Sequence, residues 1–218
     1  MKLHKAIFDM DGLIFDSERL FMDFLGAAMA QRGYKLTRDV YVECLGFDRN
    51  TVAGFMRSVY GEDYPFDEMS DRARDAMRAA ALDGLPVKKG IVGLLEYLKQ
   101  NNVECVVASS SETKFVEMYL KNAGLSGYFT ELIGGERVKK SKPEPEIFLK
   151  ALGTTPKCEA VIFEDSENGV RAAVNAGIGV VCIPDMKRPS DEVLKQAIAC
   201  VNDAHEAVEV IENMYRRN

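Results

Sequence analysis

The chain has 218 residues, 47% of them hydrophobic and 28% charged, which suits one large globular domain or a core domain carrying a smaller one. The formal net charge of -6 argues against a nucleic-acid partner, because phosphate backbones are bound by basic patches. No apolar run approaches the roughly 18 residues of a membrane helix, and no segment has the pattern of a signal peptide. We therefore expect a cytoplasmic protein with no membrane partner.

The cysteines do not indicate a disulfide framework or a zinc site. Their number is odd, no two form a CxxC pair, and neither His4 nor His205 lies near a cysteine pair. Free thiols in a reducing compartment fit this pattern best. The five are Cys44, Cys105, Cys158, Cys182 and Cys200.

The first part of the chain predicts one strand followed by helices. Residues 6–8 are apolar and lead into the acidic turn 9–12, which predicts a buried strand that ends in carboxylates. Ser17 can open a helix, because apolar residues recur after it at helical spacing. Two further helices are expected, over about residues 48–60 and 66–82.

After a breaker at residues 83–86, strands and helices alternate. Strands are predicted at 104–108, 160–163 and 179–183, and helices at 91–99, 113–122, 148–152, 170–176 and from Ser190. Such alternation predicts an α/β fold, a doubly wound, Rossmann-like parallel sheet with helices on both faces. We expect a core domain of residues 1–16 and 86–218, with an inserted α-helical cap domain of residues 17–85.

Polar side chains follow three of the predicted strands. Asp9 and Asp11 follow the first strand, Ser109–Ser111 follow the second, and Glu164 and Asp165 follow the third. In an open parallel sheet this edge is where ligands bind. Carboxylates that converge there would repel one another, and Mg²⁺, which prefers hard oxygen ligands, would relieve the repulsion. Magnesium in turn favours phosphoryl substrates.

The spacing of Asp9 and Asp11 suits a division of labour. Residues two apart in extended backbone point the same way, so one carboxylate can attack while the other moves a proton. Taken alone, the Asp-x-Asp-Gly sequence is also compatible with a simple polar turn. The apolar strand before it and the matching acidic strand end at Glu164 and Asp165 favour the catalytic interpretation.

Four stretches resemble, in order and spacing, the four signatures of the haloacid dehalogenase superfamily. They are residues 8–17 (FDMDGLIFDS), 106–110 (VVASS), 142–148 (KPEPEIF) and 163–169 (FEDSENG). The resemblance covers essentially the whole chain. The helical insertion directly after the first signature is similar to the small helical cap of the phosphoglycolate phosphatase and β-phosphoglucomutase branch.

The resemblance implies a role for each matching residue. Asp9 would attack phosphorus to form an aspartyl-phosphate, and Asp11 would protonate the leaving oxygen and then activate water. Ser109 and the backbone N–H of Ser110 would hold a phosphoryl oxygen, and Lys142 would neutralise charge on the transferring group. The alternatives from the residues alone are a helix cap for the serines and a surface position for Lys142.

The resemblance also implies a Mg²⁺ cofactor. Its ligands would be Asp9, the carbonyl oxygen of Asp11, and Asp165, with Glu164 beside them or acting through water. For Glu164, a purely structural acid at a strand end is the alternative. The substrate implied is a small phosphorylated metabolite, with a sugar phosphate favoured by the branch, and we expect a monomer or weak homodimer.

Three other functions compete with a phosphatase. A hydrolytic dehalogenase of the same superfamily would lack Asp11, and a phosphoacceptor regulatory module would be shorter, without the helical insertion. A β-phosphoglucomutase resembles this chain at Gly46 and Arg49, where Arg49 could bind a distal phosphate. Such mutases carry a histidine at the place of Phe21 and a lysine at the place of Leu45, so a phosphatase is favoured.

The cap is expected to supply the substrate specificity. Closure of the cap would exclude water once substrate is bound, with hinges near Ser17 and at residues 83–86. The candidate substrate contacts are Glu18, Phe21, Phe24, Leu45, Phe47, Arg49 and Thr51. For Phe21 and Phe24, burial in the core of the cap is the alternative.

Overall fold

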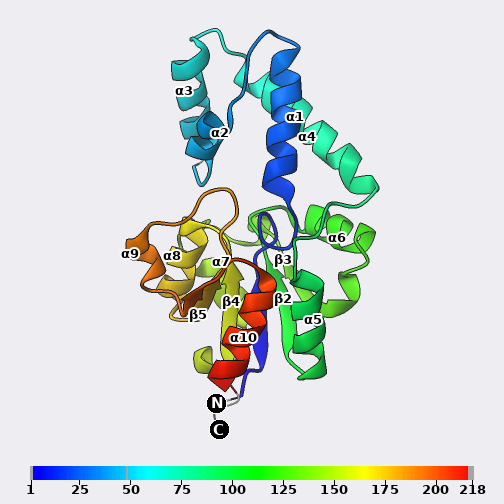
Figure 1. Ribbon diagram of the computed structural model, residues 1–218, viewed down its shortest axis with the longest axis vertical. Helices are drawn as coiled ribbons and strands as arrows, with labels where there is room; N and C mark the ends of the chain where they lie inside the picture. The colour runs from blue at the N-terminus through cyan, green and yellow to red at the C-terminus, as the bar shows by residue number, and fades with distance from the viewer. Residues whose placement is uncertain (1, 48, 216–218) are drawn as a thin grey trace.

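The computed structural model describes residues 2–47 and 49–215, and its core is a six-stranded parallel sheet (Figure 1). The strand order is β3-β2-β1-β4-β5-β6, and every neighbouring pair is parallel. The strands are β1 (Lys5–Phe8), β2 (Glu104–Ala108), β3 (Phe129–Ile133), β4 (Ala160–Glu164), β5 (Gly179–Cys182) and β6 (Ala199–Cys200). The predicted fold, a Rossmann-like sheet with an inserted helical cap, is confirmed.

Helices cover both faces of the sheet because the central strands are apolar on both sides. In β1 all four residues are buried: Ala6 and Phe8 pack into one hydrophobic cluster, and Ile7 packs into the other. The first cluster lies under α5 (Ile91–Gln100), α6 (Thr113–Asn122) and α10 (Ala204–Tyr215). The second lies under α7 (Glu146–Leu152), α8 (Glu167–Ala176) and α9 (Asp191–Leu194). Short 3-10 turns are η1 (Ser126–Tyr128), η2 (Gly135–Arg137) and η3 (Lys157–Glu159).

The cap consists of four helices inserted between β1 and α5, and it stands above the carboxyl edge of the sheet in Figure 1. They are α1 (Ser17–Ala30), α2 (Arg38–Cys44), α3 (Arg49–Tyr60) and α4 (Phe66–Leu82). The cap has a hydrophobic cluster of its own, in which Met29, Met56 and Met69 are almost completely buried. Phe21 and Phe24 both pack against that cluster, in agreement with the alternative considered for them.

The two segments that join the cap to the core run side by side. Phe15 forms an antiparallel bridge with Val87, and the flanking backbone bonds are Asp16 N–H to the Pro86 carbonyl (2.9 Å) and Lys88 N–H to the carbonyl of Ile14 (2.9 Å). The hydroxyl of Ser17 accepts a bond from the backbone N–H of Gly12 at 3.2 Å and does not cap α1. Both connections are therefore tied to the turn that follows β1.

The core also contacts the cap through residues 185–187, which we call the docking segment. The side chain of Met186 is buried in the cap cluster, and its carbonyl accepts a bond from Arg38 of α2 at 2.8 Å. Nearby, Asn168 of α8 donates to the carbonyl of Gly46 at 2.7 Å. These contacts place α2 against the docking segment and the turn after α2 over the start of α8.

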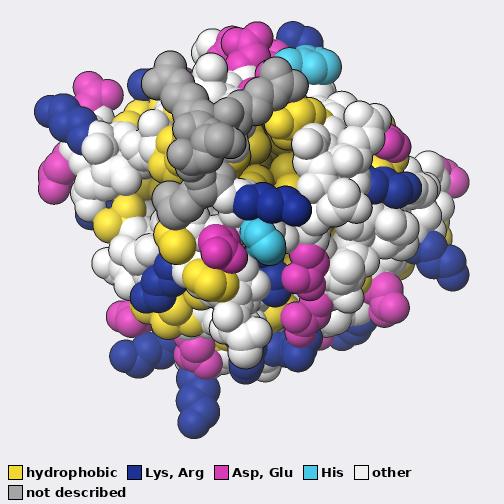
Figure 2. All heavy atoms as spheres, turned by 90° about the horizontal axis from the view of Figure 1, so that it is seen from below, with side chains coloured by type: hydrophobic (Ala, Val, Ile, Leu, Met, Phe, Trp, Pro, Cys, Tyr) yellow, Lys and Arg dark blue, Asp and Glu magenta, His cyan; other side chains and the backbone are white. Residues whose placement is uncertain are grey.

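Among the described α-helices and strands, α2, β3, β6 and α10 were not predicted from the sequence. β3 is an edge strand whose central residues face solvent, and β6 has only two residues, so neither presents a continuous apolar run. Within the described part of the chain, no helix combines the length and apolarity required to cross a bilayer. Figure 2 shows the end opposite the cap, where side chains of both charges are interspersed.

Candidate active site

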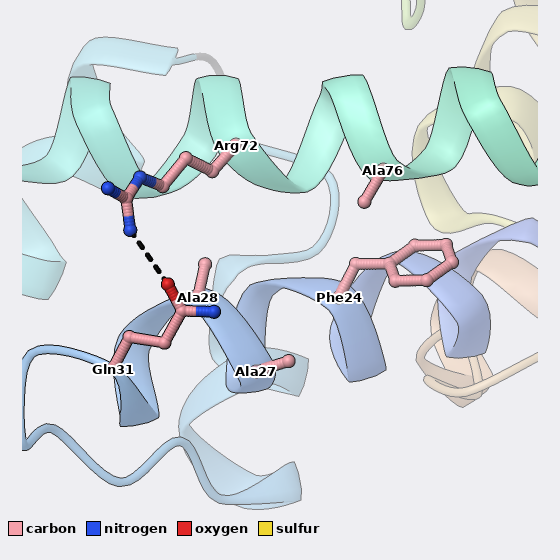
Figure 3. Close-up of a pocket in the computed structure, with 6 residues that line it drawn as sticks. All are labelled: Phe24, Ala27, Ala28, Gln31, Arg72 and Ala76. Carbon is pink, nitrogen blue, oxygen red and sulfur yellow. Dashed lines mark hydrogen bonds between the residues drawn. The ribbon is translucent and has the colours of Figure 1, made fainter.

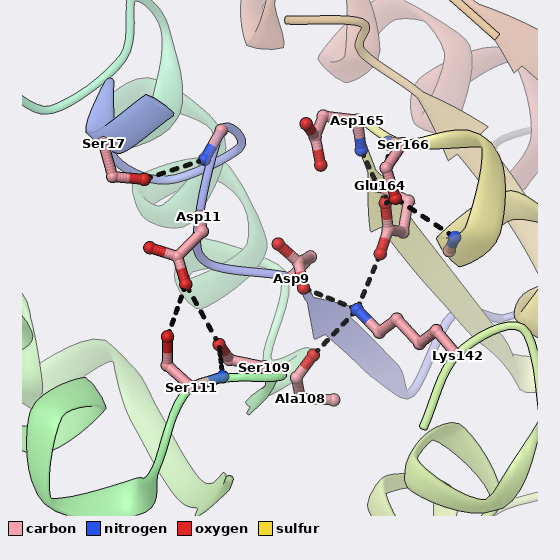
Figure 4. A network of polar contacts seen from close by, with 12 residues as sticks. Asp9, Asp11, Ser17, Ala108, Ser109, Ser111, Lys142, Glu164, Asp165 and Ser166 are labelled. Carbon is pink, nitrogen blue, oxygen red and sulfur yellow. Dashed lines mark hydrogen bonds and ion pairs between the residues drawn. The ribbon is translucent and has the colours of Figure 1, made fainter. Parts of the chain in front are cut away.

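The site lies at the carboxyl edge of the three central strands (Figure 4). Phe8 of β1 is in register with Val107 of β2 and with Phe163 of β4, so the residues that follow these three positions emerge at the same level. The backbone N–H of Asp9 donates to the carbonyl of Phe163 at 3.0 Å, which extends the pairing by one residue. Strand register alone therefore brings distant parts of the chain together here.

Three carboxylates form a compact group at this edge. Asp9, Glu164 and Asp165 each offer an oxygen, and these oxygens lie within 4.8 Å of one another. Asp9 and Glu164 are buried, while Asp165 is half-buried. The described residues thus contain an oxygen-only donor set of the kind that hard divalent cations prefer.

Lys142 lies among these acids. Its ammonium is 2.5 Å from an oxygen of Asp9 and 2.6 Å from an oxygen of Glu164, and it also donates to the carbonyl of Ala108 at 3.3 Å. Burial acts to lower the pKa of Lys142, but the charges of Asp9 and Glu164 outweigh it and hold that pKa above its usual value. The side chain is therefore a buried lysine whose charged form is favoured by its acidic neighbours, and not a surface lysine.

Glu164 is held in one orientation. Its second oxygen accepts from the backbone N–H groups of Asp165 (2.8 Å) and Ser166 (2.9 Å) and from the hydroxyl of Ser166 (3.0 Å). A Cβ atom at Gly169 would lie only 1.8 Å from the Glu164 carboxyl, so the glycine leaves the room that this orientation needs. The four contacts, including Lys142, fix where the carboxylate points.

Asp11 faces a different set of partners. Its carboxylate accepts from the hydroxyls of Ser111 at 2.7 Å and Ser109 at 3.4 Å, and the Ser109 oxygen in turn accepts from the Ser111 backbone N–H at 3.0 Å (Figure 4). Asp11 is therefore not in the compact group of carboxylates. The contact with Ser111 was not expected, because only the polarity of the serine run was visible in the sequence.

The electrostatics of the group leave negative charge uncompensated. Burial raises the pKa of Asp9 to about 7, with Lys142 opposing the shift and Glu164 adding to it. Burial, followed by the charges of Glu164 and Asp9, also raises the pKa of Asp165 well above its usual range. One ammonium among three acids is too little positive charge, and a divalent cation would supply the remainder. The residues present therefore fit Mg²⁺.

A glycine brings the first turn close to the second acid. Gly12 has a φ of +78°, and a Cβ atom there would lie 2.4 Å from an oxygen of Asp165. Only glycine fits both the left-handed backbone and this approach. The turn after β1 and the turn after β4 are thus packed against each other at the carboxylates.

Two of the predicted phosphate-binding residues share a small cavity next to the acids. The cavity has a volume of about 110 Å³ and opens beside Lys142. It is lined by Ser110, Gly135, Val138, Ser141, Lys142 and Ile147. Ser110 and Lys142 thus line one cavity, and Lys142 joins it to the carboxylates of Asp9 and Glu164.

Cap residues approach this site to different degrees. Glu18 at the start of α1 accepts from the Tyr41 hydroxyl at 2.6 Å, and burial raises its pKa to about 7 although that hydrogen bond opposes the shift. Arg49 instead forms ion pairs with Asp67 (2.7 Å) and Asp71 (3.4 Å) of α4. In this structure, its guanidinium is held within the cap.

A larger hollow, of about 310 Å³, lies between α1 and α4 (Figure 3). Its lining includes Arg72, which donates to the Gln31 side chain at 2.9 Å across the hollow. The lining residues are Phe24, Ala27, Ala28, Gln31, Arg72 and Ala76. It contains no carboxylate or nucleophile, so the chemistry belongs to the edge of the sheet.

Known proteins match this chain over most of its length. A family model described as haloacid dehalogenase-like hydrolase matches residues 6–183. The "Phosphorylated carbohydrates phosphatase" of Thermotoga maritima is 28% identical, over 81% of this chain and 82% of the relative. The "Probable pseudouridine-5'-phosphatase" of Drosophila melanogaster is 31% identical, over 84% of this chain and 83% of the relative.

Solved structures with a similar fold cover almost the whole chain. CbbY from Rhodobacter sphaeroides, solved in complex with phosphate, is 25% identical with a TM-score of 0.77, covering 94% of this chain and 96% of that one. A β-phosphoglucomutase from Clostridium difficile has the same fold at 21% identity, with a TM-score of 0.75 and coverage of 98% and 97%.

Proposed function

The chain belongs to the haloacid dehalogenase-like hydrolase family, and we propose that it is a magnesium-dependent phosphatase acting on a small phosphorylated metabolite, a sugar phosphate. The observation that carries the proposal is the group formed by Asp9, Glu164 and Asp165 with Lys142 inside it. Relatives named as phosphatases, one of them for phosphorylated carbohydrates, support the substrate class.

Asp9 is the proposed nucleophile. One of its oxygens is paired with Lys142, which leaves the other free to attack phosphorus and form an aspartyl-phosphate. Lys142, Ser109 and the backbone N–H of Ser110 would hold the phosphoryl oxygens on which charge accumulates. Mg²⁺, held by Asp9, Asp165, the carbonyl of Asp11 and Glu164 directly or through water, would add positive charge at the same place.

Asp11 is the proposed acid and base. Its carboxylate is oriented by Ser109 and Ser111 and stands apart from the group around Lys142. A carboxyl so placed can give a proton to the leaving oxygen and then take one from the water that hydrolyses the aspartyl-phosphate. The two aspartates of the first signature would thus have separate tasks set by their separate partners.

We further propose that residues 1–16 and 86–218 form the core domain and residues 17–85 the cap domain. Glu18 is the best supported of the proposed substrate contacts, because it is a half-buried carboxyl at the base of the cap whose pKa is raised by burial. The proposed contact of Arg49 with a distal phosphate would require its guanidinium to leave Asp67 and Asp71. A monomer or weak homodimer is proposed, which sedimentation would measure.

A phosphosugar mutase is the second candidate, favoured by the shared fold with a β-phosphoglucomutase and by the match at Gly46 and Arg49. A mutase must return the phosphoryl group to a second sugar hydroxyl, and its cap must bind sugar phosphate for this purpose. Phe21 and Leu45 stand where such mutases carry a histidine and a lysine, and they offer no polar group. Hydrolysis is therefore the proposed reaction.

A phosphate-release screen tests both candidates. Purified protein is assayed over a panel of sugar phosphates with Mg²⁺ and with EDTA, including glucose 1-phosphate with its bisphosphate activator. We expect continuing phosphate release that requires Mg²⁺ and is abolished by Asp9→Asn, whereas Asp75→Asn, an exposed acid of the cap, keeps the rate. Conversion of glucose 1-phosphate to glucose 6-phosphate without net phosphate release would favour the mutase.

A further inference from the structure

Two cysteines face each other on neighbouring strands, away from the acids. Cys182 of β5 and Cys200 of β6 are direct partners in the parallel register. Neighbouring strands lie about 4.8 Å apart, and disulfides join Cα atoms about 4.4–6.8 Å apart. Paired positions project to the same face of a sheet, and both cysteines pack into the cluster under α7 and α8. The pair therefore meets the distance requirement for a disulfide with little movement of the short edge strand β6.

The two thiols have different surroundings. Cys182 is completely buried, and burial, followed by the charge of Cys200, raises its pKa. Cys200 is half-buried, and the guanidinium of Arg188 donates to its sulfur at 3.1 Å. A positive charge beside a partly accessible sulfur is the environment in which nucleophilic cysteines are found. Cys200 is thus suited to react first and Cys182 to react second.

We propose that Cys182 and Cys200 form a site of reversible oxidation, at which a hydroperoxide converts the two thiols into a disulfide. The Cys200 thiolate attacks the hydroperoxide, the O–O bond breaks, and the products are a sulfenic acid and an alcohol, or water from hydrogen peroxide. The sulfur of Cys182 then attacks the sulfenic sulfur, the S–O bond breaks, and water leaves with the thiol proton. The two electrons lost by the cysteines reduce the peroxide.

Oxidation at this place would reach the candidate active site, a consequence that rests on the proposed function. Cys182 is in register with Glu164 of β4, and the backbone N–H of Ile183 donates to the Glu164 carbonyl at 2.8 Å. The chain then continues into the docking segment 185–187, and Arg188 follows it. A disulfide would remove the sulfur partner of Arg188 and pull on the strand end that carries the docking segment. We expect slower phosphate release in the oxidised protein.

The test is stoichiometric oxidation of the full chain with hydrogen peroxide, followed by thiol counting in denaturant. We expect the number of free thiols to fall from five to three and to return to five with dithiothreitol. Non-reducing peptide mapping should find one cross-link, between the peptides of Cys182 and Cys200. Phosphate release should fall with the formation of this cross-link and recover with reduction.

Single-cysteine variants provide the controls. Cys158→Ser removes an exposed cysteine and should leave the cross-link unchanged, whereas Cys200→Ser should prevent it and keep phosphate release during the same treatment. If no thiols are lost, or if the linked peptides contain Cys44, Cys105 or Cys158, the proposed site is wrong. Thiol counts and mapping do not depend on phosphatase activity, so failure of this proposal is distinguishable from failure of the proposed function.

Discussion

A substitution at Gly12 tests whether phosphate release depends on the close approach of the turn after β1 to Asp165. Gly12→Ala would place a methyl group 2.4 Å from the Asp165 carboxyl, so we expect it to displace that acid and abolish Mg²⁺-dependent phosphate release. Gly33→Ala is the matched control, because Gly33 has a similar φ of +81° and nothing within 4 Å. The backbone strain common to both costs roughly 1–2 kcal/mol. Equal activities of the two folded variants would contradict the account of Gly12.

Glu18 should make folding stability depend on pH. Its folded-state pKa of about 7 lies above the ordinary value of 4.5, so the folded protein binds the proton more tightly than the unfolded chain. The stabilisation is complete below the ordinary pKa and is lost as the pH rises through 7. We expect the free energy of unfolding, measured with urea in metal-free buffer, to fall between pH 5 and 8 in the wild type. In Glu18→Gln this fall should be smaller than in the wild type, by up to roughly 3 kcal/mol.

The control for Glu18 is Asp23→Asn, which neutralises an exposed acid on the same helix. It should follow the wild-type pH dependence, because solvent screens an exposed carboxylate. Glutamine keeps a carbonyl oxygen that can accept from Tyr41, so the comparison isolates the charge. Parallel pH curves for wild type and Glu18→Gln would show that Glu18 is ionised normally.

The sequence predicted some of these residue contacts and not others, for a physical reason. Asp9, Glu164 and Asp165 could be expected to meet, because parallel strands bring their carboxyl ends to one edge. The partners of Arg49 and the bond from Ser111 to Asp11 depend on side-chain rotamers and on packing between helices. Local spacing carries no information on either, so the structure was needed to find them.

At the scale of elements, the contact between α8 and the turn after α2 can be tested directly. Asn168→Ala removes the bond to the carbonyl of Gly46 and should weaken docking of the cap. A neutral hydrogen bond of this kind contributes about 0.5–1.5 kcal/mol, so kcat/KM for a sugar phosphate should fall about 2- to 10-fold. Asn101→Ala, which removes an amide that donates to the Tyr97 carbonyl within its own helix end, should not change kcat/KM. A rate unchanged in Asn168→Ala would show that this contact does not assist catalysis.

The strands that form continuous apolar runs were predicted, whereas two of the missed elements, β3 and α2, lack such a pattern; α10 was missed although its buried residues recur at helical spacing. The strands at residues 104–108 and 160–163 are fully or nearly fully buried, so each is a continuous apolar run. β3 has two exposed central residues and α2 has one buried residue, so tertiary contacts rather than pattern stabilise them. Ser17 opens α1 as expected, but its hydroxyl serves Gly12 and so links the helix to the site.

At the scale of the molecule, the candidate active site combines residues from the two core segments, 1–16 and 86–218, and it lies beneath the cap. The predicted alternation of strands and helices was enough to find the Rossmann-like sheet and the insertion. The docking segment was not predicted, because Met186 belongs to the core by sequence but packs into the hydrophobic cluster of the cap. Because the docking segment joins the core to the cap, binding of a ligand to the site should stabilise both.

Magnesium should raise the thermal unfolding midpoint, because a ligand that binds only the folded state stabilises it by mass action. At a Mg²⁺ concentration 100 times the dissociation constant the gain is about 2.7 kcal/mol. Asp165→Asn should lose most of this increase, while Asp75→Asn should keep it. An increase in the midpoint that is the same in all three proteins would place the bound ion elsewhere.

The most direct measurement is anomalous diffraction from crystals grown with Mn²⁺ as a substitute for Mg²⁺. We expect one strong peak within coordination distance of the carboxylates of Asp9 and Asp165, beside Glu164. If this position holds no metal while the enzyme still turns over in the same metal-containing solution, Asp9, Glu164 and Asp165 do not hold the ion that catalysis requires.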